Sequence, residues 1–219
     1  MKNLYIYCAG GFGKEVMDCA IRQNETFNTW EKISFIDDVA VDKERYGAKI
    51  YKIEDLLNAG SPLTIEIIIA NGEPKARNLI LSKVKKYALK LGQVIDPSVV
   101  LAKTAQLLPG VVVTPFGSIS SDTKISENVV INTMSIIGHD VEIGENSVIS
   151  SMVNIGGACK IGKNTYIGMG SLIKEKIKIG DNVIIGMGSV VYADIPDGVI
   201  ALGNPARIAR KNDDGKVFK

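Results

Sequence analysis

Residues 131–144 read INTMSIIGHDVEIG and decide the fold. Branched aliphatic residues recur in this segment every six positions, at Ile131, Ile137 and Ile143. The same spacing continues outward without a break over Ile95–Val191, which makes seventeen such positions. Neither a helix nor a hairpin has a period of six, whereas a coil of short parallel strands has one inward aliphatic side chain on each flat face. The C-terminal half is therefore predicted to be a parallel β-helix.

The other positions of the repeat predict which side chains line the coil. The position after the aliphatic residue is small and most often glycine, which avoids a Cβ clash where the chain turns. The fifth position is small or β-branched, so positions one and five are expected to face inward and positions three, four and six outward. Three repeats make one triangular coil, so residues 18 apart stack on successive coils. The segment Lys174-Glu175-Lys176 departs from the pattern, and a bulge is expected there.

The N-terminal third has the alternating signals of a small parallel α/β domain. Short apolar runs indicate strands at Leu4–Cys8, Ile33–Ile36 and Ile65–Ala70. Apolar spacing and helix-boundary residues indicate helices at Lys14–Arg22, at Ile53–Ala59 closed by Gly60, and from Pro74 to Leu91 before Gly92. We therefore expect residues 1–93 to form a Rossmann-like α/β domain and residues 94–219 to form the β-helix with a C-terminal tail.

A glycine-rich turn follows the first expected strand. Backbone N–H groups at the start of a helix bind phosphate oxygens, and the dinucleotide fingerprint for such a turn is G-x-G-x-x-G. Cys8, Gly10 and Gly13 occupy its three places, so the first glycine is missing. Asp37 and Asp38 lie near the place of a ribose-binding carboxylate. The turn either binds a nucleotide or only joins strand to helix, and the broken fingerprint disfavours a dehydrogenase.

His139 is the only histidine of the chain. It occupies the third position of its repeat and is expected to face outward. Gly157 follows 18 residues later, so it stacks beside His139 and leaves an empty column next to the imidazole. Asp140 follows directly and can orient the ring. This arrangement favours a general base over a surface histidine.

Composition excludes several classes of protein. A net charge of +2 over 219 residues gives no strong field for nucleic acid. No apolar stretch is long enough to span a membrane, and the N-terminus lacks a signal-peptide cleavage pattern. The three cysteines have neither metal-binding nor disulfide spacing. We therefore expect a cytoplasmic protein with free thiols, without a metal, and with neither a nucleic-acid nor a membrane partner.

Several motifs together resemble the hexapeptide-repeat acyltransferases. They are Ile131-Asn132-Thr133, Gly138-His139-Asp140, the run of Ile-Gly repeats, Asp194–Gly198 (DIPDG) and Gly203–Arg207 (GNPAR). With Ala9–Val16 (AGGFGKEV) and Phe35–Asp38 (FIDD), the whole chain resembles the subfamily of sialic acid O-acetyltransferases and bacillosamine-type nucleotide-sugar N-acetyltransferases. The resemblance implies a left-handed β-helix and a homotrimer, with acetyl-CoA bound in grooves between neighbouring subunits.

The resemblance also implies roles for individual residues. His139 is expected to be the general base, Asp140 to support it, and the Gly157 N–H to bind the thioester carbonyl. Further acetyl-CoA contacts are expected at Gly168, Met169, Gly186, Met187 and Ser189. Apart from the resemblance, Arg207 follows the last coil and is expected to meet the phosphates of CoA, which suit an arginine side chain. Contacts with the nucleotide sugar are expected at Gly10, Gly11, Phe12, Gly13, Asp37, Asp38 and Asn132.

Four residues depart from the pattern of the relatives. Phe12 and Asp96 stand where histidines are common, Asp140 replaces a longer glutamate, and Val148 stands where some relatives carry a second CoA-contacting histidine. Phe12 cannot donate the hydrogen bond that a histidine would donate, so the identity of the acceptor sugar is left open.

The leading hypothesis for the function is transfer of acetyl from acetyl-CoA to a nucleotide-linked 4-amino-4,6-dideoxy sugar for surface glycan biosynthesis. The alternatives are O-acetylation of sialic acid or another sugar, and a non-catalytic β-solenoid binding protein. His139 beside Gly157 argues against the last of these.

Overall fold

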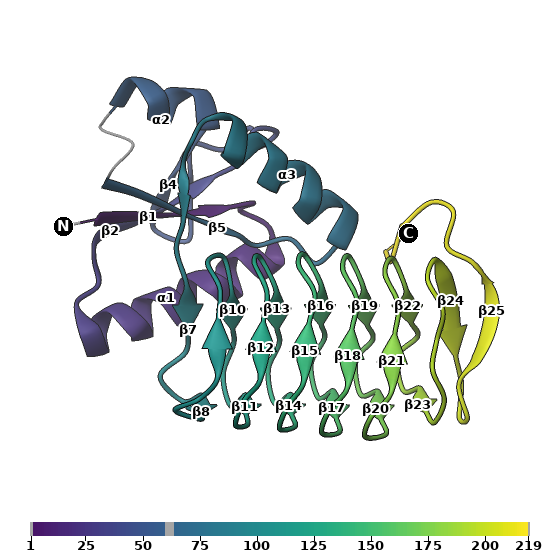
Figure 1. Cartoon of the computed structure of the whole chain (residues 1–219). Coiled ribbons are helices and arrows are strands. Elements are labelled where there is room, and N and C mark those ends of the chain that lie inside the picture. Colours follow the sequence, from purple (N-terminus) through teal and green to yellow (C-terminus); the bar gives the residue numbers. More distant parts are fainter. Residues whose placement is uncertain (1, 60–63, 219) are drawn as a thin grey trace.

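The computed structural model describes residues 2–59 and 64–218 and contains an α/β domain followed by a parallel β-helix, as predicted (Figure 1). The α/β domain lies against the N-terminal coils, and the C-terminal segment returns toward it from the last coil (Figure 1). The predicted closure of the second helix by Gly60 lies outside the described residues.

The α/β domain is built on a six-stranded sheet with the order β3-β4-β2-β1-β5-β6. Its strands are β1 (Lys2–Tyr7), β2 (Trp30–Ile36), β3 (Glu44–Arg45), β4 (Ala48–Tyr51), β5 (Ile65–Ile69) and β6 (Lys90–Leu91). Neighbouring strands are parallel except for the β3–β4 hairpin. The sequence analysis missed this hairpin. Its signal was the pair Tyr46-Gly47, whose φ angles of 55° and 73° suit a tight hairpin turn.

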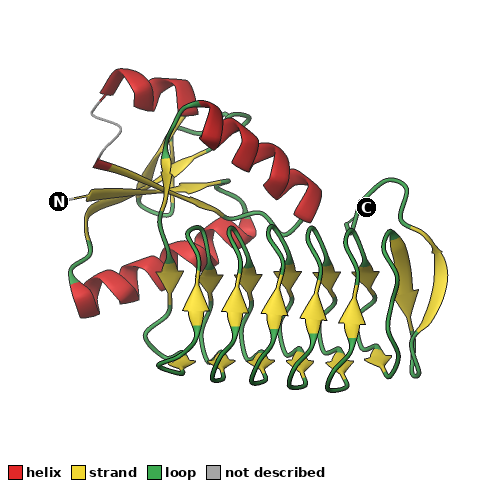
Figure 2. Ribbon diagram, viewed as in Figure 1, coloured by secondary structure: helices red, strands yellow, loops and turns green. Residues whose placement is uncertain are grey.

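Three helices cover the sheet on both faces (Figure 2). They are α1 (Gly11–Phe27) on one face, and α2 (Ile53–Ala59) and α3 (Pro74–Lys86) on the other. Strand β1 serves both layers, since Leu4 and Ile6 pack with α1 whereas Tyr5 and Tyr7 pack with α2 and α3. This is the period of two expected of a strand that is buried on both sides.

The prediction of a helix from Pro74 to Leu91 is wrong at its C-terminal end. The helix α3 ends at Lys86, and Ala88 has a φ of 52°. The chain then adds β6 beside β5. Hydrogen bonding to the edge of the sheet outweighs the helical propensity of these residues, which a local pattern does not reveal.

The β-helix consists of three sheets that we name after their first strands, and all its strands except β24 and β25 have two residues. The β7 sheet contains β7 (Val94–Ile95), β10 (Val112–Val113), β13 (Val130–Ile131), β16 (Val148–Ile149), β19 (Tyr166–Ile167), β22 (Ile184–Ile185), β24 (Val199–Leu202) and β25 (Arg207–Lys211). The β8 sheet contains β8 (Val100–Leu101), β11 (Ser118–Ile119), β14 (Ile136–Ile137), β17 (Asn154–Ile155), β20 (Leu172–Ile173) and β23 (Val190–Val191). The β9 sheet contains β9 (Gln106–Leu107), β12 (Lys124–Ile125), β15 (Glu142–Ile143), β18 (Lys160–Ile161) and β21 (Lys178–Ile179).

The predicted register is confirmed. Ile137 pairs with Ile155 one coil away, and the two side chains are 0% and 2% exposed. Position five is also interior, as the buried Val141 and Cys159 show. The backbone of each turn is left-handed at position four, for example with a φ of 58° at Asp140. The glycines of position two are therefore not the residues that carry the strained backbone conformation.

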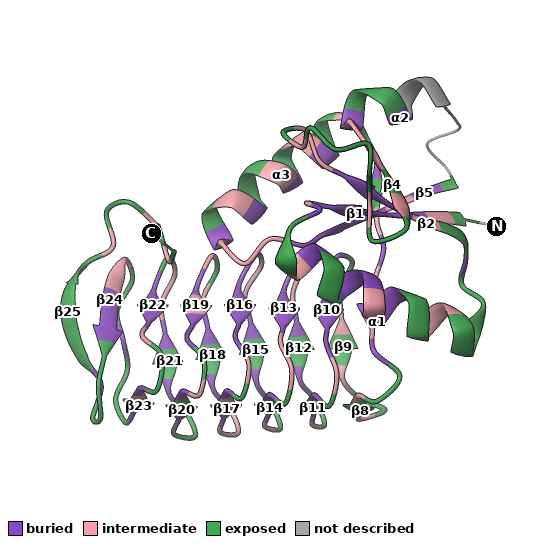
Figure 3. Cartoon of the chain, turned by 180° about the vertical axis from the view of Figure 1, so that it is seen from behind, coloured by how far each residue is buried: buried purple, intermediate pink, exposed green. Residues whose placement is uncertain are grey.

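Three details of the repeat differ from the prediction. Leu101 is 41% exposed because it lies in the first coil, where no earlier coil covers it. No bulge occurs at Lys174–Lys176, since β20 and β21 keep their regular register with the neighbouring coils. Position six of the β7 sheet is not outward: Val112 and Val130 are buried in the cluster that includes the apolar face of α1 (Figure 3).

Candidate active site

We name the corners of the β-helix after the sheets that they join. His139 lies on the β8–β9 corner, in the turn between β14 and β15. Its side chain is 67% exposed, which agrees with the outward orientation predicted from the repeat. Its Nδ1 lies 2.7 Å from Asp140 Oδ2, so Asp140 orients the ring and leaves Nε2 available.

Gly157 occupies the next coil directly beside His139. A Cβ atom built on Gly157 would lie only 2.5 Å from His139 Nε2, so the imidazole uses the space that a side chain would fill. The Ala158 N–H donates to the His139 carbonyl over 2.8 Å, which holds the two turns together. Across residues 2–59 and 64–218, the Gly157 N–H has no hydrogen-bond acceptor. An unused donor beside an available ring nitrogen can stabilise negative charge at the place where the base acts.

The glycine-rich turn lies at the start of α1. Gly10 and Gly11 border open space, since no atom of the described residues outside this turn and helix comes within 4 Å of a Cβ built on either of them. Gly13 is obligatory for a different reason, because a Cβ there would collide with the Cys8 carbonyl. Phe12 is half-buried and packs against the core beneath α1. The helix start thus presents open backbone at Gly10 and Gly11, which suits an anion.

The two acidic residues after β2 have internal partners. Asp37 accepts hydrogen bonds from the Ala9, Val39 and Ala40 N–H groups, each over 3.0 Å, and so supports the glycine-rich turn. Asp38 accepts from the Tyr7 hydroxyl and from Lys83 Nζ. Burial raises the pKa of Asp38, but its hydrogen bonds from Lys83 and Tyr7 outweigh this and keep the pKa below the usual range.

The residues expected to contact acetyl-CoA lie on another corner of the same chain. Gly168, Met169, Gly186 and Met187 belong to the β7–β8 corner, and Met169 and Met187 are 48% and 77% exposed. One chain alone therefore does not bring these residues together with His139, and a site that uses both sets needs two chains.

Three other expected contacts differ in their surroundings. Ser189 is fully buried and donates to the Gly186 carbonyl over 2.6 Å, so its hydroxyl does not face a groove. Arg207 is exposed on β25, beyond the last coil. Asn132 lies on the β7–β8 corner, and its Oδ1 is buried without a hydrogen-bond partner in the described part of the chain.

One basic residue beside the glycine-rich turn escaped the sequence analysis. Arg45 on β3 donates from Nη1 to the Ala9 carbonyl over 2.9 Å and pairs with Asp42. It is 36 residues away from the turn in sequence, and its strand was not predicted, so no local signal identified it.

The described residues contain no helix that is long and apolar enough to cross a membrane. In the same ranges, no three His, Cys, Asp or Glu side chains are grouped in a way that would hold a metal ion.

Two family models match the chain. The model of the PglD N-terminal domain matches residues 3–84, and the model of the bacterial transferase hexapeptide (six repeats) matches residues 122–157 and 158–193. A search of curated proteins found no match.

Solved structures match over both domains. The acetyltransferase domain of PglB from Neisseria gonorrhoeae in complex with acetyl coenzyme A has 28% sequence identity and a TM-score of 0.87, over 94% of this chain and 98% of that chain. WeeI from Acinetobacter baumannii has 29% identity and a TM-score of 0.86, over 95% and 100%. PerB from Caulobacter crescentus, solved with CoA and GDP-perosamine, shares the fold at 24% identity with a TM-score of 0.85, over 95% and 97%. The chain belongs to the PglD-type hexapeptide-repeat acetyltransferases.

Proposed function

We propose that the protein transfers the acetyl group of acetyl-CoA to the amino group of a nucleotide-linked sugar, with His139 as the general base. The observation that carries this proposal is the arrangement of His139, its orienting partner Asp140 and the unused Gly157 N–H. The similar structures solved with acetyl coenzyme A, and with CoA and GDP-perosamine, support the two substrates.

The chemistry follows from this geometry. The amine nitrogen of the sugar attacks the thioester carbon while His139 Nε2 accepts a proton from it. The Gly157 N–H donates to the oxygen that becomes negative in the tetrahedral intermediate. The C–S bond then breaks, and the proton passes from His139 to the departing sulfur, which gives the amide and free CoA. Asp140 holds Nδ1 throughout, so that Nε2 stays directed at the reacting groups.

The site is completed by neighbouring chains. The β8 sheet exposes large apolar side chains at its sixth positions: Val100 is 69% exposed, Ile136 49% and Leu172 45%. The adjoining β7–β8 corner exposes apolar residues at position four of three coils, Phe116, Met134 and Met152, and at position three of the next two, Met169 and Met187. An apolar surface of this kind favours association. We propose a homotrimer in which the β8 sheets face the threefold axis, so that the β7–β8 corner of one chain meets the β8–β9 corner of the next.

The glycine-rich turn supplies the acceptor side of the site. The open backbone at Gly10 and Gly11 binds the diphosphate of the acceptor, and Asp37 keeps the turn in place. The acceptor that we favour is a nucleotide-linked 4-amino-4,6-dideoxy sugar of surface glycan biosynthesis.

The test is release of the CoA thiol from acetyl-CoA in the presence of candidate acceptors. The panel contains UDP- and GDP-linked 4-amino-4,6-dideoxyhexoses, the free amino sugars and sialic acid. We expect turnover with a nucleotide-linked amino sugar and none with sialic acid. Acetylation of sialic acid alone would overturn the proposed acceptor, and the absence of thiol release with every acceptor would overturn the function.

The assignment of His139 is tested in the same assay. His139→Ala should lower kcat by about 10²–10⁴-fold, the usual contribution of a general base, while CoA binding persists. Asp140→Asn should lower kcat less, because the ring loses only its orienting partner. Lys160→Ala is the matched control, since Lys160 is exposed on the outer face of the β9 sheet and its partner there is the exposed Glu142. Near-normal kcat in His139→Ala would show that another group is the base.

A further inference from the structure

A small cavity lies beneath the C-terminal segment, on the β9–β7 corner of the β-helix. Its volume is about 250 Å³. The first turn of α3 forms one wall, the turns of two successive coils form the second, and the segment Asn212–Val217 forms the third (Figure 1). None of the residues that line the cavity belongs to the candidate active site, and His139 lies on a different corner. The cavity is therefore a separate feature of the chain.

The β9–β7 corner carries a column of asparagines, and the first two are paired. Asn128, Asn146, Asn164 and Asn182 follow one another at intervals of 18 residues, each with a left-handed φ between 51° and 61°. Arg77 donates to the Asn128 side chain, and Asn128 Nδ2 donates to Asn146 Oδ1 over 2.7 Å. Asn128 and Asn146 are 0% and 3% exposed. At these two positions the protein itself supplies the hydrogen bonds that a buried amide needs.

The column changes at Asn164, where the cavity begins. Asn164 Oδ1 is buried, and within residues 2–59 and 64–218 it accepts no hydrogen bond. Leaving a buried acceptor without a partner is costly, because the oxygen has lost its water and gained nothing in return. Asn164 lines the cavity, so a hydrogen-bond donor bound there can supply the missing partner. This unpaired oxygen is the observation that points to a ligand.

The charges around the cavity nearly cancel. Lys75 contributes one positive charge, and Asp213 and Asp214 contribute two negative charges. The N-terminus of α3 adds a partial positive charge of about half a unit. An anion would meet two carboxylates and the unpaired oxygen of Asn164, whereas a cation would meet Lys75 and the helix terminus. The surroundings therefore favour a neutral ligand.

The other lining groups favour a ligand that carries several hydroxyl groups. Asn78 and Asn182 are exposed at the cavity, and each side-chain amide can both donate and accept hydrogen bonds. Ile184 and Val217 add a small apolar surface. Amides beside an apolar surface suit the alternating hydroxyl and C–H groups of a sugar ring. Most ligand pockets have volumes of about 300–1,000 Å³, so this smaller cavity suits a single ring rather than a nucleotide.

We propose that this cavity binds a neutral monosaccharide, one hydroxyl of which donates to Asn164 Oδ1. The C-terminal segment joins the other two walls, since Asn212 Nδ2 donates to the Asn182 carbonyl over 2.8 Å and Lys75 Nζ donates to the Asp214 carbonyl over 2.9 Å. A sugar bound between the three walls therefore stabilises the segment in its place. The inference does not depend on the proposed transfer of acetyl, because the cavity and the candidate active site share no residue.

The inference is tested by saturation-transfer difference NMR with N-acetylglucosamine and glucose as probes. The wild type should bind at least one of them with a Kd of about 1 mM, which is typical of so small a ligand. Asn164→Gly removes the amide and keeps the backbone, because glycine adopts the φ of 51° without strain, and it should bind about tenfold more weakly. Lys163→Ala is the matched control, since Lys163 is exposed in the same turn and does not line the cavity.

Hydrogen exchange of the C-terminal segment places the bound sugar. At a probe concentration of ten times the Kd, amide exchange at Gly215, Lys216 and Val217 should slow about tenfold in the wild type, because the segment opens only after the sugar has left. The same concentration should leave exchange of these residues unchanged in Asn164→Gly. Inorganic phosphate and Ca²⁺, the charged probes, should not slow exchange of the segment in either protein.

Three outcomes would overturn the inference: no binding of either sugar by the wild type, equal binding by wild type and Asn164→Gly, or slower exchange of the segment with phosphate or Ca²⁺ in place of the sugar. Thiol release from acetyl-CoA by Asn164→Gly should stay within about twofold of wild type. The assay of transfer and the assay of the cavity are therefore independent, and either proposal can fail without the other.

Discussion

Cys8 has a φ of 82°, which places a residue with a Cβ atom in the left-handed region. Cys8 occupies the place of the first glycine of the dinucleotide fingerprint. The turn therefore has the left-handed backbone that this glycine would adopt, but with a cysteine side chain. A left-handed conformation costs a residue with a side chain about 1–2 kcal/mol, whereas glycine adopts it without strain. The cysteine therefore lowers the stability of the folded protein, while the backbone conformation of the turn is retained.

Replacement of Cys8 tests this strain. Both Cys8→Gly and Cys8→Ala remove the thiol, but only glycine relieves the backbone. We expect Cys8→Gly to be more stable than Cys8→Ala by about 1 kcal/mol in urea unfolding. Equal stability of the two variants would mean that the turn relaxes around residue 8.

At the scale of elements, the backbones of successive coils approach one another closely at the position-two glycines. A Cβ atom built on Gly144 would lie 2.7 Å from the carbonyl carbon of Gly162 and from the nitrogen of Lys163. These are backbone atoms of the next coil, so the coils themselves would have to separate.

Gly144→Ala should consequently destabilise the β-helix by roughly 1–3 kcal/mol, the usual cost of overpacking. Gly11→Ala is the control, because no atom lies within 4 Å of a Cβ there and the residue begins a helix. It should change stability by less than about 0.5 kcal/mol. Thermal and urea unfolding followed by circular dichroism measure both, and similar values for the two variants would refute the close-contact explanation.

At the scale of the whole molecule, a buried arginine is one of the contacts that tie the domains together besides the covalent chain. Arg77 on α3 is fully buried, and burial lowers its pKa to about 9. It donates to the Ile69 and Asn71 carbonyls at the end of β5 and to the Asn128 carbonyl on the β-helix. Buried donors need acceptors, and these carbonyls supply them from both domains.

Another of these contacts is made by the C-terminal segment. The Glu73 carboxylate, in the loop between β5 and α3, accepts hydrogen bonds from the Val217 and Phe218 N–H groups over 3.0 and 2.7 Å. The Phe218 ring packs edge-on against Tyr166, with ring centres 5.8 Å apart. The segment thus spans from the last coil to the loop that borders the glycine-rich turn.

Glu73→Gln should release this segment, because an amide offers only one acceptor oxygen and no charge. We expect amide hydrogen exchange at Val217 and Phe218 to accelerate by roughly tenfold or more, while exchange inside the β-helix is unchanged. Asp213→Asn is the control, since Asp213 is an exposed carboxylate of the same segment, whereas the Val217 and Phe218 N–H groups donate to Glu73. Unchanged exchange in Glu73→Gln would show that ring packing alone holds the segment.

The residues of the β-helix were predictable because their environment repeats along the chain. A period of six assigns each side chain to the interior or the surface, and a separation of 18 names its neighbour on the next coil. His139 facing outward beside Gly157 followed from that arithmetic, and the structure has the two residues in contact. Asp140 as the partner of the ring was predictable because adjacent residues need no tertiary information.

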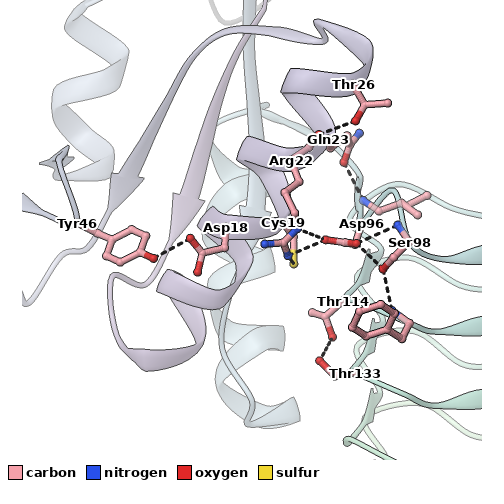
Figure 4. Close-up of polar contacts among 12 residues, drawn as sticks. Asp18, Cys19, Arg22, Gln23, Thr26, Tyr46, Asp96, Ser98, Thr114 and Thr133 are labelled. Atoms are coloured by element: carbon pink, nitrogen blue, oxygen red, sulfur yellow. Dashed lines mark hydrogen bonds and ion pairs between the residues drawn. The ribbon is translucent and has the colours of Figure 1, made fainter.

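Only the tertiary structure shows the contacts between segments whose separation in sequence follows no repeat. The sixth positions of the β7 sheet are buried because α1 covers them, and the partners of Asp38 come from β1 and α3. A small cleft between Asp18 and Arg22 on one side and Thr114 on the other exists because α1 lies beside the β7–β8 corner, which neither segment indicates alone (Figure 4). By itself the sequence determined the coil, its register and the surroundings of His139, since these depend on short or regular separations. Docking of the domains depends on side chains that meet across long, irregular separations, and so it could be seen only in three dimensions.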